Sequence, residues 1–142
     1  MFRTLTDTIL VAPQIDVTAI AAARDLGVTL VINNRPEGES DDQTPGPEIE
    51  AAARAAGLDY VAIPITHAGF SQPQVEAMVA ALDSTEGKIL AYCRSGTRST
   101  LLWALAESKE GAGADELAAI AANAGYDVTP VRPLMDMLRA SA

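Results

Sequence analysis

Several residue types are scarce in this chain of 142 residues. Cysteine, histidine and tryptophan occur once each, and ten Lys and Arg stand against 19 Asp and Glu. A single cysteine excludes an internal disulfide and fits a reducing compartment. One His and one Cys supply no set of metal ligands, so no metal or other cofactor is expected. The net charge of −9 argues against nucleic acid or an anionic membrane as a partner, because both repel an acidic protein.

Long apolar runs are also missing. The first seven residues lack the apolar core of a signal peptide, and no stretch approaches membrane-spanning length. We therefore expect a cytoplasmic protein. The length and an apolar content of 49% fit a single domain over residues 1–142 with one packed core.

Short apolar runs do occur, and they alternate with helical patterns. Strands are expected at 9–11, 28–32, 60–65 and 88–92, and helices over 17–25, 48–56, 71–82 and 100–107, with two short amphipathic helices in the tail. Ser71-Gln72-Pro73-Gln74 matches a helix capping box. The alternation predicts an α/β fold with a central, mainly parallel sheet flanked by helices. Ligands of such sheets bind at the carboxyl ends of the strands.

Cys93 lies at one of those ends. It follows the apolar run 88–92 and opens the loop Cys93-Arg94-Ser95-Gly96-Thr97-Arg98-Ser99, which leads into a helical stretch. Backbone N–H groups in such a turn and the positive end of the following helix stabilise a thiolate, and two arginines add positive charge. The loop therefore predicts a covalent-catalysis site with Cys93 as nucleophile. The alternative is that Cys93 is only a small buried residue, which its polar neighbours disfavour.

The other loop residues have expected roles of their own. Arg98 would hold an anionic donor and balance the thiolate. Arg94 either guides the anion at the mouth of the pocket or only covers the surface. The hydroxyls of Ser95 and Thr97 either bind the sulfur or only hold the turn, and Ser99 is a further candidate substrate ligand. Gly96 belongs to the same substrate-binding set and supplies a backbone shape that other residues resist.

Two more residues are candidates by position alone. Arg35 and His67 each follow an expected strand and could lie at the same rim of the sheet. His67 is the only histidine, but it has no visible partner and a structural or surface role is the stronger hypothesis. Asp41 and Asp42 would supply an acid if the long polar loop over 36–47 folds over Cys93; a solvated loop is the simpler alternative.

The loop Tyr92-Cys93-Arg94-Ser95-Gly96-Thr97-Arg98 resembles the active loop of rhodanese-type sulfurtransferases, whose cysteine carries a persulfide. Cysteine phosphatases of the tyrosine and dual-specificity type are similar but place five residues between Cys and Arg, and that position here is Ser99. Those phosphatases also use an Asp on the loop that here reads Thr66-His67-Ala68-Gly69-Phe70, which has no carboxylate. The shorter spacing makes a tighter ring, which suits a single terminal sulfur on the cysteine better than three phosphoryl oxygens. The missing Asp matters little to sulfur transfer, because sulfite needs little help from an acid as it leaves. Both departures therefore favour sulfur transfer.

Outside this loop, the order of elements resembles the dual-specificity phosphatase scaffold. The order of elements and the stretch Asn34-Arg35-Pro36-Glu37-Gly38-Glu39 together resemble a bacterial family related to the N-terminal domain of beta-lactamase hydrolase-like proteins. Members of this family are described as phosphatase-like or as sulfurtransferases. The resemblance covers residues 2–106. It implies a persulfide carrier, a small anionic sulfur donor, a thiol acceptor and a functional partner in sulfide oxidation.

The sequence thus predicts a sulfurtransferase in which Cys93 takes sulfur from thiosulfate or another sulfane-sulfur donor and passes it to a thiophilic acceptor. A phosphatase that works through a phosphocysteine is the first alternative. A binding module that recognises a small anion without turnover is the second.

Overall fold

The apolar runs of the sequence form one five-stranded sheet. The computed structural model describes residues 1–142, and its strands lie in the order β1-β2-β5-β3-β4. The short β1 (Arg3–Thr4) is antiparallel to β2 (Ile9–Ala12). The remaining strands, β5 (Lys88–Tyr92), β3 (Val28–Asn33) and β4 (Asp59–Ala62), run parallel to β2. The expected mainly parallel α/β sheet is therefore confirmed.

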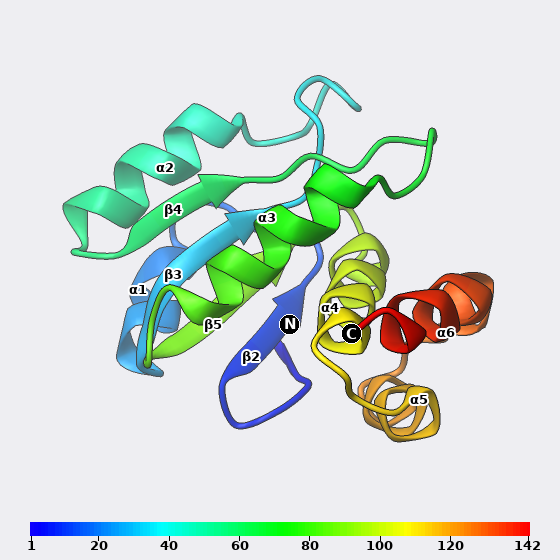
Figure 1. The fold of residues 1–142 in the computed structure, drawn as a ribbon. Helices are drawn as coiled ribbons and strands as arrows, with labels where there is room; N and C mark the ends of the chain where they lie inside the picture. The colour runs from blue at the N-terminus through cyan, green and yellow to red at the C-terminus, as the bar shows by residue number, and fades with distance from the viewer.

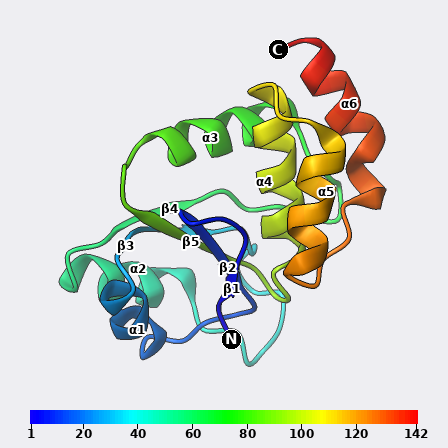
Figure 2. The same cartoon turned by 90° about the horizontal axis from the view of Figure 1, so that it is seen from below.

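Helices cover both faces of this sheet (Figures 1 and 2). On one face, α1 (Ala19–Asp25) and α2 (Gly46–Ala55) bury apolar side chains against β3 and β5. On the other face lie α3 (Gln72–Asp83) and α4 (Thr97–Lys109), with a larger apolar core beneath them. None of the helices combines the length and the apolar character needed to cross a membrane.

The tail forms a second layer outside α4 rather than on the sheet. Helix α5 (Ala114–Asn123), the 3₁₀ turn η1 (Thr129–Val131) and helix α6 (Arg132–Ala140) follow in order, and α5 and α6 both pack on α4. Figure 2 shows them beyond α4 as seen from the sheet. Because α4 lies between the sheet and this layer, most of its side chains are buried. That burial fixes the position of the helix that follows Cys93.

Local sequence signals explain where the elements begin and end. The capping box is present: the N–H of Gln74 donates to Ser71 Oγ, and the N–H of Ser71 donates to Gln74 Oε1. Strand β4 ends at Ala62, three residues earlier than expected. Pro64 has no N–H to offer, yet Ile63 and Ile65 still donate to the carbonyls of residues 33 and 34, so the chain stays beside β3.

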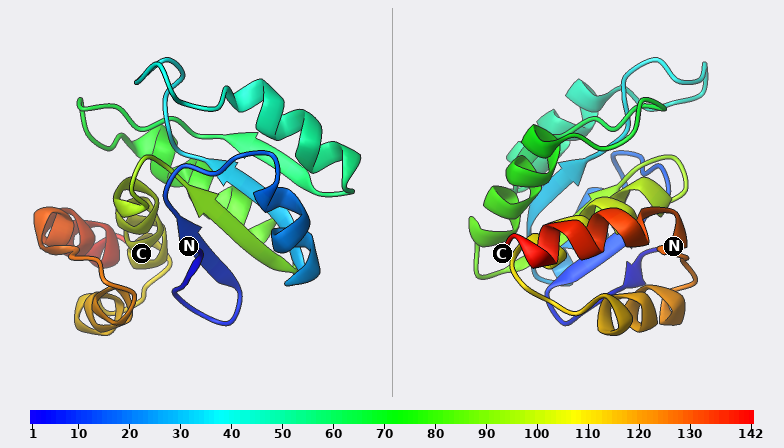
Figure 3. Two further views of the ribbon diagram at one scale, coloured as in Figure 1. Left: turned by 180° about the vertical axis from the view of Figure 1, so that it is seen from behind. Right: turned by 45° about the vertical axis from the view of Figure 1, so that its right-hand side comes forward.

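Two long loops extend past the carboxyl ends of the parallel strands. One joins β3 to α2 and the other joins β4 to α3; they are the cyan and green loops at the right-hand end of the sheet in Figure 1. Both views of Figure 3 show them beyond the same end of the sheet. The Cys93 loop, between β5 and α4, opens at this end as well.

Candidate active site

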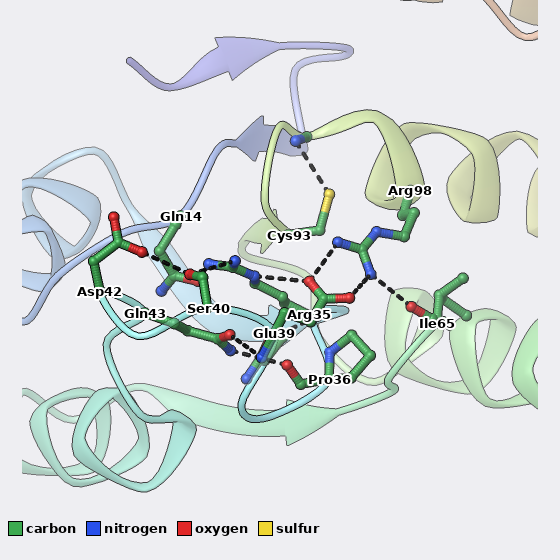
Figure 4. Close-up of polar contacts among 12 residues, drawn as sticks. Gln14, Arg35, Pro36, Glu39, Ser40, Asp42, Gln43, Ile65, Cys93 and Arg98 are labelled. Carbon is green, nitrogen blue, oxygen red and sulfur yellow. Dashed lines mark hydrogen bonds and ion pairs between the residues drawn. The ribbon is translucent and has the colours of Figure 1, made fainter. Parts of the chain in front are cut away.

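Cys93 lies in a tight turn between the central strand and a buried helix. Strand β5 ends at Tyr92 and α4 begins at Thr97, which leaves four residues for the turn. The Cys93 side chain is fully buried, and its Sγ accepts a hydrogen bond of 3.1 Å from the backbone N–H of Gly96, the N-cap of α4 (Figure 4). The sulfur therefore faces the positive end of a thirteen-residue helix. This setting suits a nucleophile that attacks an anionic group.

Gly96 meets two demands that another residue would not. Its φ is +90°, in the left-handed region, and a Cβ there would collide with the hydroxyl of Tyr126. Tyr126 Oη donates to the carbonyl of Ser95 at 3.1 Å, and the Arg3 guanidinium lies 5.4 Å from the centre of the tyrosine ring. The segment after α5 thus supports the outer side of the Cys93 turn.

Arg98, in the first turn of α4, points toward the same site. Its Nη1 donates to Glu39 Oε2 at 2.7 Å and to the carbonyl of Ile65 at 2.8 Å, and its Nη2 donates to Glu39 Oε1 at 2.8 Å. The carboxylate of Glu39 raises the pKa of Arg98, and the nearby Cys93 adds to the effect. Arg98 thus carries a fixed positive charge beside the thiol (Figure 4).

Glu39 is bound from both sides by arginines. Besides Arg98, it accepts a hydrogen bond of 2.9 Å from Arg35 Nε. These partners, Arg98 before Arg35, lower the pKa of Glu39 from 4.5 to about 2. Arg35 is itself buried and also donates to Gln14 Oε1 and Ser40 Oγ. The Glu39 carboxylate therefore stays ionised at any physiological pH and does not serve as a general acid.

The other residues predicted for the site are not all directed at Cys93. Ser99 is buried and donates to Asn34 Oδ1 at 2.7 Å, which ties α4 to the end of β3. Ser95 and Thr97 are hydrogen-bonded to each other through their hydroxyls at 3.0 Å. The Arg94 side chain is exposed, while its carbonyl accepts from the N–H of Gln14.

The two rim candidates differ in position. Arg35 lies behind Glu39 and reaches the site only through that carboxylate. His67 is exposed on the turn that the Thr66–Gly69 bridge closes. Asp42 accepts from Ser40 Oγ at 2.6 Å, which lowers its pKa, and Asp41 is exposed. The loop over 36–47 therefore makes its hydrogen bonds to Arg98 through Glu39, and Asp42 is near enough to Arg94 for that charge to help lower its pKa.

Sequence reasoning missed Glu39 and Gln14 as parts of the site. Glu39 is 59 residues away from Arg98 in the chain, and Gln14 is 21 residues away from Arg35. No local spacing links such pairs. The signal that was present is the stretch over residues 34–39, which carried the family resemblance and contains both Arg35 and Glu39.

The domain has the α/β fold of the tyrosine and dual-specificity phosphatases, with a cysteine at the carboxyl end of the central strand and an arginine in the first turn of the buried helix that follows. A sequence model of the family described as "Beta-lactamase hydrolase-like protein, phosphatase-like domain" matches residues 1–111. The chain belongs to this family.

Individual relatives agree with this assignment. A beta-lactamase hydrolase-like protein from Xylella fastidiosa is 37% identical over 103 residues, which are 72% of this chain and 24% of that protein. The chain thus spans about a quarter of the length of the curated relatives it matches. A Neisseria meningitidis protein described as a candidate phosphatase superimposes with a TM-score of 0.84 at 29% identity, over 96% of this chain and 97% of that one. PTPMT1, at 13% identity, shares the fold with a TM-score of 0.76 over 99% and 97% of the two chains.

These findings confirm the family and the phosphatase-like scaffold that the sequence predicted. The names of these relatives and structures refer to phosphatases or to beta-lactamase hydrolase-like proteins, and none of these names refers to sulfur transfer. The comparisons therefore support the phosphatase alternative better than the sulfurtransferase prediction.

Proposed function

We propose that this domain is a cysteine-dependent phosphatase in which Cys93 carries the phosphoryl group. The observation that carries the proposal is the placement of the Cys93 sulfur: it is buried at the N-terminus of α4, bonded to the N–H of Gly96, and lies beside Arg98 on a phosphatase-type fold. Positive charge and backbone donors around one nucleophile suit a reaction on an anionic group.

The reaction has two steps. The Cys93 thiolate attacks phosphorus, a sulfur–phosphorus bond forms, and the bond from phosphorus to the leaving oxygen breaks, with the electron pair going to that oxygen. Water then attacks the phosphocysteine and loses a proton to solvent, and the sulfur–phosphorus bond breaks with its electron pair going to sulfur. Phosphate is released and the thiolate is restored. Arg98 stabilises the charge on the phosphoryl oxygens in both steps.

The absence of a nearby acid narrows the substrate class. Glu39 is held ionised, and the turn over 66–69 contains no carboxylate. An alkoxide leaving group needs a proton at departure, whereas a phenolate needs little help. We therefore expect aryl phosphates to be cleaved and simple alkyl phosphates to be poor substrates.

A second candidate, transfer of sulfane sulfur, is favoured by the same lack of an acid and by the spacing of Arg98, five positions after Cys93. In this reaction the thiolate attacks the outer sulfur of thiosulfate, the sulfur–sulfur bond breaks, and sulfite leaves with the electron pair. A thiophilic acceptor then takes the outer sulfur from the persulfide. The sulfur donor, the thiol acceptor and the partner in sulfide oxidation belong to this candidate, and they stay predictions, as does the cytoplasmic location.

One experiment separates the two candidates. The purified protein and Cys93→Ser are assayed with para-nitrophenyl phosphate and glycerol phosphate, and parallel samples are incubated with thiosulfate and weighed by intact mass spectrometry. The phosphatase proposal predicts hydrolysis of the aryl ester only, reduced by about a thousandfold or more in Cys93→Ser.

The sulfurtransferase would replace the phosphatase proposal if only the wild type gained the mass of one sulfur atom and hydrolysed neither ester. Cyanide should then remove this sulfur and release thiocyanate. Anion binding without either reaction would leave the binding module predicted as the second alternative. Either result would overturn the proposed reaction while keeping Cys93 at the centre of the site.

A further inference from the structure

Tyr126, on the turn after α5, reaches the Cys93 turn from outside the sheet. We infer that it is a positioning residue for the nucleophile: its hydroxyl holds the peptide between Ser95 and Gly96 so that the N–H of Gly96 faces the Cys93 sulfur. This inference rests on the proposed function only in taking Cys93 as the nucleophile. It applies to phosphoryl transfer and to sulfur transfer alike.

A single peptide unit takes part in both of the hydrogen bonds concerned. Tyr126 Oη donates to the carbonyl of Ser95 at 3.1 Å, and the N–H of Gly96 donates to Cys93 Sγ at 3.1 Å. That carbonyl and that N–H belong to the same trans peptide, in which the two groups point in opposite directions. A hydroxyl that fixes the carbonyl on the outside of the turn therefore fixes the N–H on the inside, toward the sulfur.

This peptide depends on an external contact because glycine lets it rotate. Gly96 has φ +90°, and glycine adopts positive and negative φ about equally readily. Rotation of the peptide plane would replace the N–H with the carbonyl oxygen, whose partial negative charge would then face the sulfur. Tyr126 Oη is the only group that donates to the carbonyl of Ser95. The hydroxyl thus opposes the rotation that would remove the N–H from the sulfur.

The end of α5 holds Tyr126 in place. The N–H groups of Gly125 and Tyr126 donate to the carbonyls of Ala122 and Ala121, and Gly125 has φ +94°. These bonds form a Schellman motif, which fixes the backbone of Tyr126 relative to α5. Helix α5 packs on α4, and Figure 2 shows the end of α5 beside the start of α4. The hydroxyl therefore reaches the Cys93 turn from a rigid support.

Arg3 fixes the tyrosine ring from its face. The Arg3 guanidinium lies 5.4 Å from the centre of the ring, where a cation is attracted to the aromatic face, and Arg3 Nη1 donates to the carbonyl of Ala124 at 2.8 Å. Burial raises the pKa of Tyr126, and Cys93 adds to this effect while Arg3 opposes it. The hydroxyl therefore stays protonated at neutral pH and is able to donate to Ser95.

The alternative role for Tyr126 is packing alone, in which the ring fills space beside Gly96 and the hydroxyl has no effect on the sulfur. Tyr126→Phe separates the two roles, because it keeps the ring and its contact with Arg3 and removes only the hydroxyl. A positioning role predicts a change at Gly96 and at Cys93. A packing role predicts no change at either residue.

The first measurement is the rate of Cys93 alkylation by iodoacetamide as a function of pH, which requires no turnover. An N–H that donates to sulfur favours the thiolate over the thiol, and the thiolate is the reactive species. We expect Tyr126→Phe to move the pH profile upward by about half a unit, which slows alkylation about threefold below its midpoint. Tyr60→Phe is the matched control, because it removes a hydroxyl that accepts from Asn33 Nδ2 at 3.0 Å and should leave the profile unchanged.

The second measurement follows the peptide itself, through hydrogen exchange of the Gly96 amide detected by NMR. We expect this amide to exchange about tenfold faster in Tyr126→Phe, while the amides of β5 keep their rates. An unchanged alkylation profile, or an equal shift in Tyr60→Phe, would overturn the inference. A shifted profile with an unchanged Gly96 amide, or with equally faster exchange throughout β5, would overturn it too, because the effect would not pass through this peptide.

The result is independent of the reaction. An alkylation profile that depends on the Tyr126 hydroxyl in a protein without phosphatase activity would keep the positioning role and remove the proposed function. Full phosphatase activity in Tyr126→Phe with an unchanged alkylation profile would do the reverse.

Discussion

The two ends of the parallel sheet carry opposite chemistry. At the carboxyl end, Cys93 lies among two buried or half-buried arginines and one carboxylate, and each of these charges is paired. At the amino end, a cavity of about 430 Å³ is walled by Trp103, Leu82 and other side chains, with carboxylates from Asp83, Glu86 and Glu107. Burial and the neighbouring carboxylates raise the pKa of Glu107, which has no cation beside it.

The difference shows that a cavity in the surface need not be the site. The cavity repels anions because carboxylates are the only charged groups in its wall. The Cys93 end is compact, but it joins a nucleophile, a helix N-terminus and a fixed guanidinium. On a chain of net charge −9, that local concentration of cations favours binding of an anion at the Cys93 end over the rest of the surface.

The largest effect that sharpens this comparison is expected from Arg98→Lys. A lysine ammonium keeps the charge but cannot bind the Glu39 carboxylate and two substrate oxygens in one plane. We expect kcat/KM for an aryl phosphate to fall about a hundredfold, mostly through kcat, with little change in the melting temperature. A loss below about threefold, measured by steady-state kinetics, would mean that charge alone serves at this end of the sheet.

At the carboxyl end of the sheet, the sequence predicted the strands and helices better than the side-chain contacts between them. The apolar run over 88–92 became β5 with those bounds, and the capping box formed, because both depend on neighbours in the chain. Glu39 escaped prediction because its role comes from an arginine that the fold brings close. Ser99 was predicted to bind substrate, but the buried Asn34 takes its hydroxyl, a contact that only the packing of α4 on β3 creates.

A second, smaller effect is expected in how the free energy of unfolding depends on pH, and it has opposite signs at the two ends of the sheet. Glu39 has a folded pKa of about 2 against an ordinary value of 4.5, so its stabilisation is complete above about pH 4.5 and is lost as the pH falls toward 2. We expect Glu39→Gln to be about 1–2 kcal/mol less stable than the wild type at pH 6, since partial solvent access weakens the pairs. Denaturant unfolding at several pH values should show the gap closing in acid. A gap that stays constant with pH would assign the loss to packing instead.

The smallest effect, with the opposite sign, is expected at the amino end. Burial raises the pKa of Glu107, so ionisation of this carboxyl costs the folded state stability above about pH 4.5. Glu107→Gln should therefore be more stable than the wild type at pH 7 by a few tenths of a kcal/mol, because the group is partly solvated, and equally stable at low pH. Thermal melts at both pH values measure this difference.

Activity toward an aryl phosphate is the decisive second readout for Glu107→Gln. Glu107 and Arg98 lie nine residues apart on α4, about 14 Å along the helix axis, so the substitution should leave kcat and KM unchanged. A change in KM alone would mean that the cavity takes part in substrate binding, and the two ends of the sheet would then be one site. Unchanged kinetics with a higher melting temperature would confine the chemistry to the end where Glu39 holds Arg98 beside Cys93.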